Sequence, residues 1–295
     1  MKIKKIILIV LFNVLILINL YVISDYFLFA KYTYNVIPIN DIDILHKTSR
    51  FEQELPYDKS KASIVIMGCS YAWGEGLTKK ETFPYKLQKF SNRKVYNYAE
   101  SGHSIQHVLY KLQNSDFFNA KLNPEYIIYV FMGDHLSRMY RNFFNIYDSK
   151  KYLRYKKSQN ILLPIQFNIT LVDYIKVTFL AKKFNNYAYS IKKEKEKFND
   201  LKGYLILCKN IIKEKYKNTK FVVLVYNANL DSHGFKPFHT DKWSEIEKEG
   251  IIVINFDTDE YNFLLEKDCR NFDYIHPSGK AWDKLVPVII KKLNL

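Results

Sequence analysis

The stretch SIVIMG, residues 63–68, followed by Cys69 and Ser70, decides the fold of this chain. It is a short run of apolar, mostly β-branched residues that stops at a glycine, which is typical of a strand buried on both faces of a parallel sheet. Further runs of this kind follow at 94–99, 125–133, 220–227 and 250–257. The sequence therefore predicts five strands.

Helical segments are expected between and after these strands. They lie around 82–91, 104–115, 189–217 and 240–248, and a final helix runs from Pro277 to about Leu293. Alternating strands and helices imply a parallel sheet with right-handed crossovers and helices on both faces. The expected fold class is α/β, a three-layer flavodoxin-like sandwich with a central five-stranded parallel sheet. Ligands on such a sheet bind at the carboxyl ends of the strands.

Two segments of the chain do not fit a minimal α/β unit. Residues 134–188 are rich in Tyr, Arg, Asn and Phe and show weak periodicity, so they are interpreted as an insertion near the mouth of a site. A lid or a substrate-binding wall and an irregular surface excursion are both compatible with this composition. Residues 30–61, which Pro38 and Pro56 punctuate, are interpreted as a stalk or as a segment laid over the domain at 62–295.

An N-terminal transmembrane helix is expected over residues 6–29. Its first part, 6–23, contains no charged residue, and the aromatic extension that follows completes the roughly 20 apolar residues that a tilted helix needs to cross a bilayer. A cleavable signal peptide would have a shorter apolar core and small residues at a cleavage site, so an uncleaved signal anchor is favoured. The lysines in residues 1–5 keep this tail in the cytoplasm. We therefore expect a single-pass cell-membrane protein whose α/β domain is extracytoplasmic.

Charge and cysteine content argue against some classes of function. The net charge of +15 suits nucleic acid, an anionic membrane surface or an acidic polymer. The cations are spread along the chain and no recognition module is visible, so nucleic acid is not an expected partner. The chain has an odd number of cysteines, Cys69, Cys208 and Cys269, and they lie far apart in the sequence. This argues against a disulfide framework. His103 and His107 lie four residues apart but lack an evident third ligand, so no metal is expected.

A serine directly follows the first expected strand, at the carboxyl edge of the sheet. In this place the hydroxyl of Ser70 can face a cleft, and its backbone N–H can point at a developing oxyanion. Serine and glycine at a strand end are also ordinary turn residues, so Ser70 alone does not define a site.

A carboxylate and an imidazole lie three residues apart just before the last helix. In this short turn, Asp273 can accept a hydrogen bond from one ring nitrogen of His276, which leaves the other nitrogen able to take a proton from a serine. The alternative is that Asp273 caps the helix and that His276 is incidental.

Taken together, these segments resemble the SGNH, or GDSL-like, hydrolase superfamily in a membrane-anchored bacterial form. The resemblance begins with Ser70 after the first strand and D-x-x-H at 273–276. The segment NYAESGHS, residues 97–104, looks like the second block of the family, and FMGDH, residues 131–135, stands where the third block reads Gly-x-Asn. The blocks occur in the right order over about residues 62–290.

The resemblance implies a catalytic site and an oxyanion hole. Ser70, Asp273 and His276 match the triad, and the backbone N–H groups of Ser70 and Gly102 match two oxyanion donors. The asparagine that donates its side-chain N–H in the third block is replaced by His135, whose imidazole also has an N–H to donate.

One further position departs from the family's pattern, and a polar cluster adds to it. Cys69 replaces the aspartate that usually precedes the serine, but this position is not part of the triad. Asp134 and Arg138 form a polar cluster with His135 at the end of the third strand. Arg138 is expected either to bind an anionic group of the substrate or to pair with Asp134 in a structural salt bridge.

The resemblance predicts a serine esterase or O-acyltransferase that acts on an acylated cell-envelope glycan or lipid. It requires no metal and no organic cofactor. The expected partners are the membrane, through the N-terminal helix, and an acylated polysaccharide or lipid-linked substrate. The missing asparagine motivates an alternative, a catalytically impaired domain with a binding or scaffold role in surface-polymer assembly. Binding of the basic residues to a membrane surface is compatible with either function.

Overall fold

The computed structural model describes residues 52–113, 124–140, 153–156, 161–164, 194–226, 240–273 and 275–295, together with Asn13. Asn13 is helical and exposed, and the rest of the predicted membrane segment at 6–29 lies outside the described residues. Within the described ranges, no helix is both long and apolar enough to cross a membrane.

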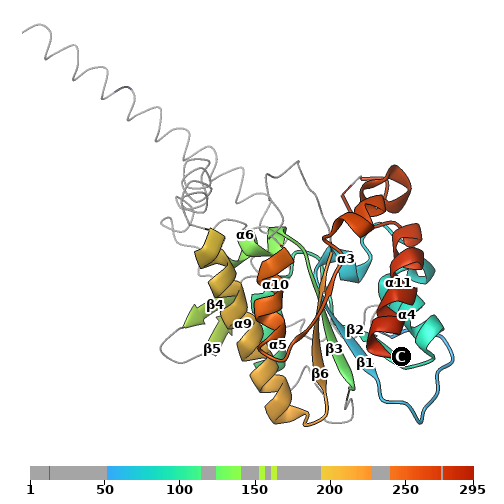
Figure 1. Cartoon of the computed structure of the whole chain (residues 1–295), viewed down its shortest axis with the longest axis horizontal. Helices are drawn as coiled ribbons and strands as arrows, with labels where there is room; N and C mark the ends of the chain where they lie inside the picture. Colours follow the sequence, from blue (N-terminus) through green and yellow to red (C-terminus); the bar gives the residue numbers. More distant parts are fainter. Residues whose placement is uncertain are drawn as a thin grey trace, which may run out of the picture.

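A five-stranded parallel sheet forms the centre of the domain (Figure 1). Its strands are β1 (Ile64–Gly68), β2 (Val95–Asn97), β3 (Tyr126–Phe131), β6 (Lys220–Val225) and β7 (Ile252–Asn255). Their order is β2-β1-β3-β6-β7, and all four pairings are parallel. The five predicted strands are confirmed. Because the order reverses direction between β1 and β3, the crevice for a ligand is expected at the carboxyl ends of these two strands.

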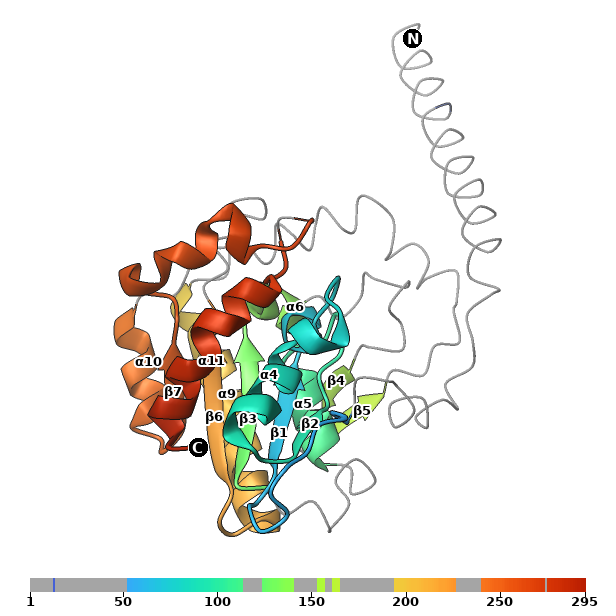
Figure 2. The ribbon, with the colours of Figure 1, turned by 90° about the vertical axis from the view of Figure 1, so that its right-hand side faces the viewer.

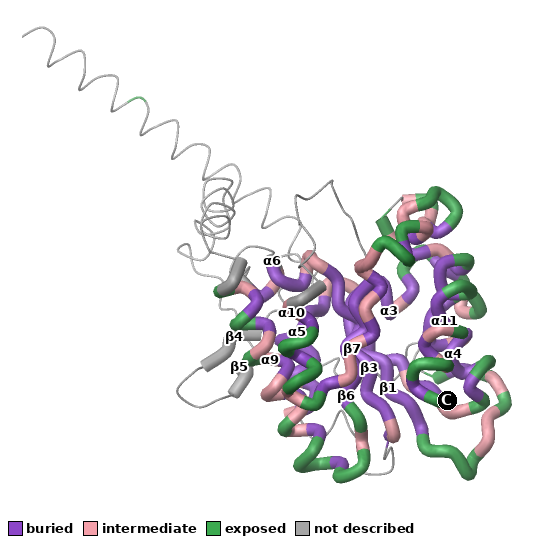
Figure 3. The backbone as a smooth tube through the Cα atoms, viewed as in Figure 1, coloured by how far each residue is buried: buried purple, intermediate pink, exposed green. Residues whose placement is uncertain are grey.

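The central strands are buried on both faces, as their unbroken apolar runs predict. Successive side chains of a strand point to opposite faces. Accordingly, Ile64 and Ile66 of β1 join one core cluster, whereas Val65 and Met67 join the other. All four are fully buried, and Figure 3 shows the whole centre of the sheet as buried.

Helices cover both faces of the sheet, which confirms the three-layer sandwich (Figures 1 and 2). One face carries α4 (Phe83–Ser91) and α11 (Gly279–Leu293), and the other carries α5 (Ile105–Gln113), α9 (Glu194–Lys215) and α10 (Thr240–Glu247). The last helix begins two residues after Pro277, because the hydroxyl of Ser278 caps it by accepting a hydrogen bond from the backbone N–H of Ala281.

Several shorter elements were not expected from the sequence. They are α3 (Ser70–Trp73), α6 (Asp134–Tyr140), the 3₁₀ turns η2 (Lys79–Glu81), η6 (Asp259–Leu265) and η7 (Lys267–Cys269), and the antiparallel pair β4 (Leu153–Lys156) and β5 (Ile161–Pro164).

The predicted insertion at 134–188 therefore needs a different boundary. Residues 134–140 form α6, which is anchored in the core through Leu136 and Met139 and so belongs to the α/β domain. The β4–β5 pair lies near α5. The remaining residues of the insertion, and with them any lid, lie outside the described residues.

The end of the predicted stalk lies on the domain. Glu52 forms an antiparallel bridge with Tyr96 of β2, and the amide of Gln88 donates to the carbonyl oxygens of Gln53 and Leu55. Residues 52–61 are thus laid over the domain, and residues 30–51 lie outside the described residues.

Candidate active site

Ser70 lies at the carboxyl end of β1, in a turn that requires a glycine. Gly68 has φ of +144°, and a Cβ at this position would lie 2.9 Å from the carbonyl oxygen of Val130 on the neighbouring strand β3. Only glycine adopts this conformation readily and allows so close an approach. The chain then turns at Cys69 into the short helix α3, and Ser70 is its first residue.

Asp273 and His276 form a hydrogen-bonded pair on one turn. The turn is closed by a bridge between Arg270 and Pro277 and by a hydrogen bond from Asn271 N to His276 O (2.7 Å). Oδ2 of Asp273 lies in close contact with Nδ1 of His276. Since Ser278 caps α11, Asp273 is not the helix cap but the partner of the imidazole.

Backbone hydrogen bonds hold the carboxylate of Asp273 in its ionised form. Oδ1 accepts from the N–H groups of Ile275 and His276, each at 2.9 Å. Partial burial alone would raise the pKa of Asp273, but the hydrogen bonds from His276 and Ile275 outweigh it and lower the pKa below its ordinary value. A negative carboxylate against Nδ1 orients the ring and stabilises an imidazolium.

Tyr71 links the serine turn to the histidine turn. Its hydroxyl donates to the carbonyl oxygen of Ile275 (2.7 Å), and its ring meets the His276 ring edge-on, with centroids 5.3 Å apart. Among the hydrogen bonds of the described residues, none joins Ser70 to His276. The two turns are connected through Tyr71 and through Asn271, whose Nδ2 donates to the carbonyl oxygen of Glu75 (3.0 Å). Catalytic hydrogen bonds often tighten only when substrate binds. The role of Tyr71 is not evident from the sequence, because an aromatic residue after a serine is not a distinctive pattern.

Replacing Tyr71 with phenylalanine should lower kcat for an ester substrate about tenfold with little change in KM. The carbonyl oxygen of Ile275, next to His276, loses its donor, while the ring contact and the hydrogen bond from Asn271 to Glu75 remain. The matched control is Tyr126→Phe. The hydroxyl of Tyr126 donates to the carbonyl oxygen of Leu293 (2.8 Å) at the amino end of β3, away from Ser70. Each variant should lose about 1 kcal/mol of unfolding free energy. Equal kcat values for the two variants would show that Tyr71 has no special role.

Gly102 lies on a turn beside the end of β1. We call residues 99–103 the oxyanion turn. Glu100 N donates to the carbonyl oxygen of Gly68 (3.1 Å), His103 N donates to that of Glu100 (3.2 Å), and Gly102 has φ of +79°. Among the described residues, none accepts a hydrogen bond from the N–H of Gly102. This arrangement is compatible with the predicted role of that N–H as an oxyanion donor.

The structure does not support an oxyanion role for His135. The side chain is fully buried, Nδ1 is 2.6 Å from the hydroxyl of Tyr129, and the ring stacks on that tyrosine and meets Phe131 edge-on. Burial, with the nearby charge of Arg138, lowers the pKa of His135 well below its ordinary value, so the ring is neutral. His135 is the second residue of α6, which turns it into the core on the side of Tyr129 and away from solvent.

Asp134 and Arg138 form the second of the two predicted arrangements, an ion pair. Nε of Arg138 donates to Oδ2 of Asp134 (2.7 Å), one helical turn away, and Nη1 donates to the carbonyl oxygen of His103 (3.0 Å). Cys69, which precedes Ser70, is a buried thiol whose pKa is raised by burial and then partly lowered by the charge of Arg138.

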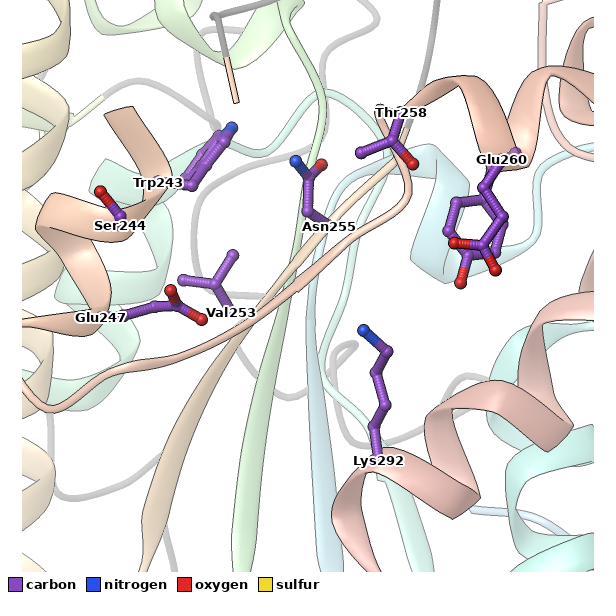
Figure 4. A pocket seen from close by; sticks show the side chains of 9 residues that line it. Trp243, Ser244, Glu247, Val253, Asn255, Thr258, Glu260 and Lys292 are labelled. Carbon is purple, nitrogen blue, oxygen red and sulfur yellow. The ribbon is translucent and has the colours of Figure 1, made fainter. Parts of the chain in front are cut away.

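A separate hollow of about 310 Å³ lies along β7 (Figure 4). Trp243 and Glu247 of α10 approach it on one side of the strand, and Lys292 of α11 approaches it on the other. No residue of the Ser70, Asp273 and His276 set lines it, so this hollow is distinct from the candidate active site.

No family model matches this chain, and no curated protein matches its sequence. Several solved structures are similar at low identity. TesA is 13% identical, over 78% of this chain and 97% of that chain, with a TM-score of 0.48. A member of the lipolytic protein G-D-S-L family from Veillonella parvula is 11% identical, over 79% of this chain and 97% of that chain, with a TM-score of 0.45. The psychrotrophic esterase EstA from Pseudoalteromonas is 14% identical, over 80% of this chain and 100% of that chain, with a TM-score of 0.43.

Proposed function

We propose that this protein is a serine-dependent esterase or O-acyltransferase of the SGNH type, with Ser70, His276 and Asp273 as its catalytic triad. The observation that carries this proposal is the orientation of His276, whose Nδ1 faces the ionised carboxylate of Asp273. The turn that bears both residues is bound by Tyr71, the immediate neighbour of Ser70.

The reaction proceeds through an acyl-enzyme. The hydroxyl oxygen of Ser70 attacks the carbonyl carbon of the ester while Nε2 of His276 takes the hydroxyl proton. Asp273 stabilises the resulting imidazolium, and the N–H groups of Ser70 and Gly102 bind the oxyanion. His276 then protonates the departing alkoxide. Water, or the hydroxyl of an acceptor, attacks the acyl-Ser70 ester with His276 again acting as the base, which restores the enzyme.

The substrate we propose is an acylated glycan or lipid of the cell envelope. The N-terminal segment at 6–29 supports this choice, because an anchored domain meets polymers and lipids more readily than free metabolites. Phe272 and Ile275 also support it. They are 78% and 38% exposed, and they lie near Asp273 on the turn that carries Asp273 and His276. Exposed apolar side chains beside a site favour a substrate with an apolar part.

A second candidate function is a binding or scaffold role in surface-polymer assembly. The burial of His135 favours it, because this imidazole then does not replace the asparagine of the third block as a donor. Loss of one oxyanion donor typically lowers the rate of acyl transfer by about 10²–10³-fold. A domain with this loss can retain its affinity for the acylated polymer.

Hydrolysis of p-nitrophenyl acetate by the full chain in detergent tests the first function. Ser70→Ala should lower kcat about 10⁶-fold, because the variant lacks the hydroxyl that forms the acyl-enzyme. The matched control is Ser91→Ala. Ser91 is a buried serine at the end of α4 whose hydroxyl donates to the carbonyl oxygen of Leu87. Equal activity of wild type and Ser70→Ala would rule out the triad, and saturable polymer binding without turnover would support the second candidate.

A further inference from the structure

Because His135 lies in the core, its side chain does not supply an oxyanion donor. Among the described residues, the donors that the proposed function uses are two backbone N–H groups, those of Ser70 and Gly102. Ser70 is held by β1 and α3. Gly102 lies on the oxyanion turn at 99–103, and a donor misplaced by about 1 Å can cost about 10²-fold in rate. The supports of this turn therefore decide how well the site works.

One support comes from α5. The ammonium of Lys111, which is almost fully buried, donates to the carbonyl oxygen of Tyr98 (2.7 Å) and to Oε1 of Glu100 (2.6 Å). Oε2 of Glu100 lies 3.3 Å from Nε2 of His103. These contacts hold the start of the oxyanion turn and one of its side chains from the side of α5.

A second support comes from α6, and it crosses the end of β1. Arg138 belongs to the helix that follows β3, and its Nη1 donates to the carbonyl oxygen of His103, on the turn that follows β2. Because β1 lies between β2 and β3 in the sheet, this hydrogen bond spans the strand end that bears Ser70. The carboxylate of Asp134 accepts a hydrogen bond from Nε of the guanidinium. The side chain of Arg138 is only 17% exposed and that of Asp134 only 13%.

We propose that Arg138 is a positioning residue that fixes the oxyanion turn, and that it compensates in part for the amide donor missing from the third block. The inference rests on the proposed function. A planar guanidinium suits this task, because it binds a carboxylate and a carbonyl oxygen in two fixed directions. Lysine at this position is a single point charge on a flexible chain and cannot keep both bonds in the same geometry.

The alternative role of Arg138, direct binding of an anionic group of the substrate, makes a different prediction. A substrate-binding cation acts mainly on KM and only for anionic substrates. A positioning residue acts mainly on kcat and does so for a neutral ester as well.

Steady-state kinetics of the full chain with p-nitrophenyl acetate separate these roles. Arg138→Ala should lower kcat about 10²-fold with KM within about twofold. Arg138→Lys should recover part of the loss, and millimolar guanidinium chloride should raise the kcat of Arg138→Ala. The matched control is Arg93→Ala. Arg93 likewise binds a carboxylate and a carbonyl oxygen, those of Glu125 and Ala62, but at the amino ends of the strands, away from Ser70.

Amide hydrogen exchange provides a second readout that does not need activity. Exchange in the oxyanion turn at 99–103 should rise in Arg138→Ala and stay unchanged in Arg93→Ala. Unchanged exchange in this turn, an equal fall of kcat in both variants, or a raised KM with unchanged kcat would each overturn the inference. Faster exchange in Arg138→Ala together with a wild type that hydrolyses no ester would instead count against the proposed function and leave the positioning role in place.

Discussion

Replacing Asp273 with asparagine is expected to lower kcat about 10⁴-fold while the fold is retained. Asparagine has the same shape, so its oxygen still accepts the backbone N–H groups of Ile275 and His276. Its amide nitrogen, however, then faces Nδ1 of His276 with hydrogen atoms in place of a negative charge. The imidazole is forced into the tautomer that has its proton on Nε2, and it can no longer take a proton from Ser70.

Kinetics on a soluble ester and thermal unfolding of the full chain check this result together. The control is Asp268→Asn, because Asp268 lies nearby and pairs with Lys280 at the surface (2.9 Å). This variant should keep kcat within about twofold of wild type, since an exposed ion pair contributes little. If Asp273→Asn kept more than about a tenth of the wild-type kcat, Asp273 would not be the partner of a general base.

Replacing Gly68 with alanine should have the largest effect on stability. A positive φ in this region costs an alanine about 1–3 kcal/mol. The added Cβ would lie 2.9 Å from the carbonyl oxygen of Val130, a backbone atom that cannot move aside. Overpacking of this kind costs about 1–3 kcal/mol more. We therefore expect a loss of about 4 kcal/mol in the free energy of unfolding, with displacement of the turn that carries Ser70.

Urea denaturation measures this loss, with Gly203→Ala as the control. Gly203 lies inside α9 with no atom within 4 Å of an added Cβ, so alanine there should stabilise the protein by up to about 1 kcal/mol. A Gly68→Ala protein as stable as wild type would mean that β1 and β3 do not approach each other as described.

The fold was predictable because its strands carry their signal locally. Each strand of the sheet belongs to a short, mainly apolar run, and β1 and β3, which are buried on both faces, contain no charged residue. The order of the blocks then placed Ser70 and the 273–276 turn at the same edge. Even the choice between cap and catalytic partner for Asp273 depended only on Ser278, a standard N-cap residue next to the helix.

At the third block, the resemblance to the family does not predict where the side chain points. A motif gives the position of a residue along the chain, but the helix that begins at Asp134 decides where its side chain points, and α6 turns His135 into the core. The clue in the sequence was the spacing of Asp134 and Arg138, since residues four apart pair on one face of a helix. The hydrogen bond from Arg138 to His103 joins helix α6 to the turn after β2, two segments far apart in the sequence, and no local pattern encodes it.

The β4–β5 pair was missed for a different reason. Each of its strands is four residues long, and they lie in a segment of weak periodicity. A strand of this length offers at most two alternations of polar and apolar residues, which is too few to distinguish it from a loop.

Covalent labelling with a fluorophosphonate tests the central claim most directly. The full chain would be treated in detergent, digested and analysed by tandem mass spectrometry. The proposed mechanism predicts one adduct on the hydroxyl oxygen of Ser70, absent in Ser70→Ala and formed much more slowly in His276→Ala. No adduct on Ser70 in the folded wild type, or an adduct on another residue that persists in Ser70→Ala, would contradict it.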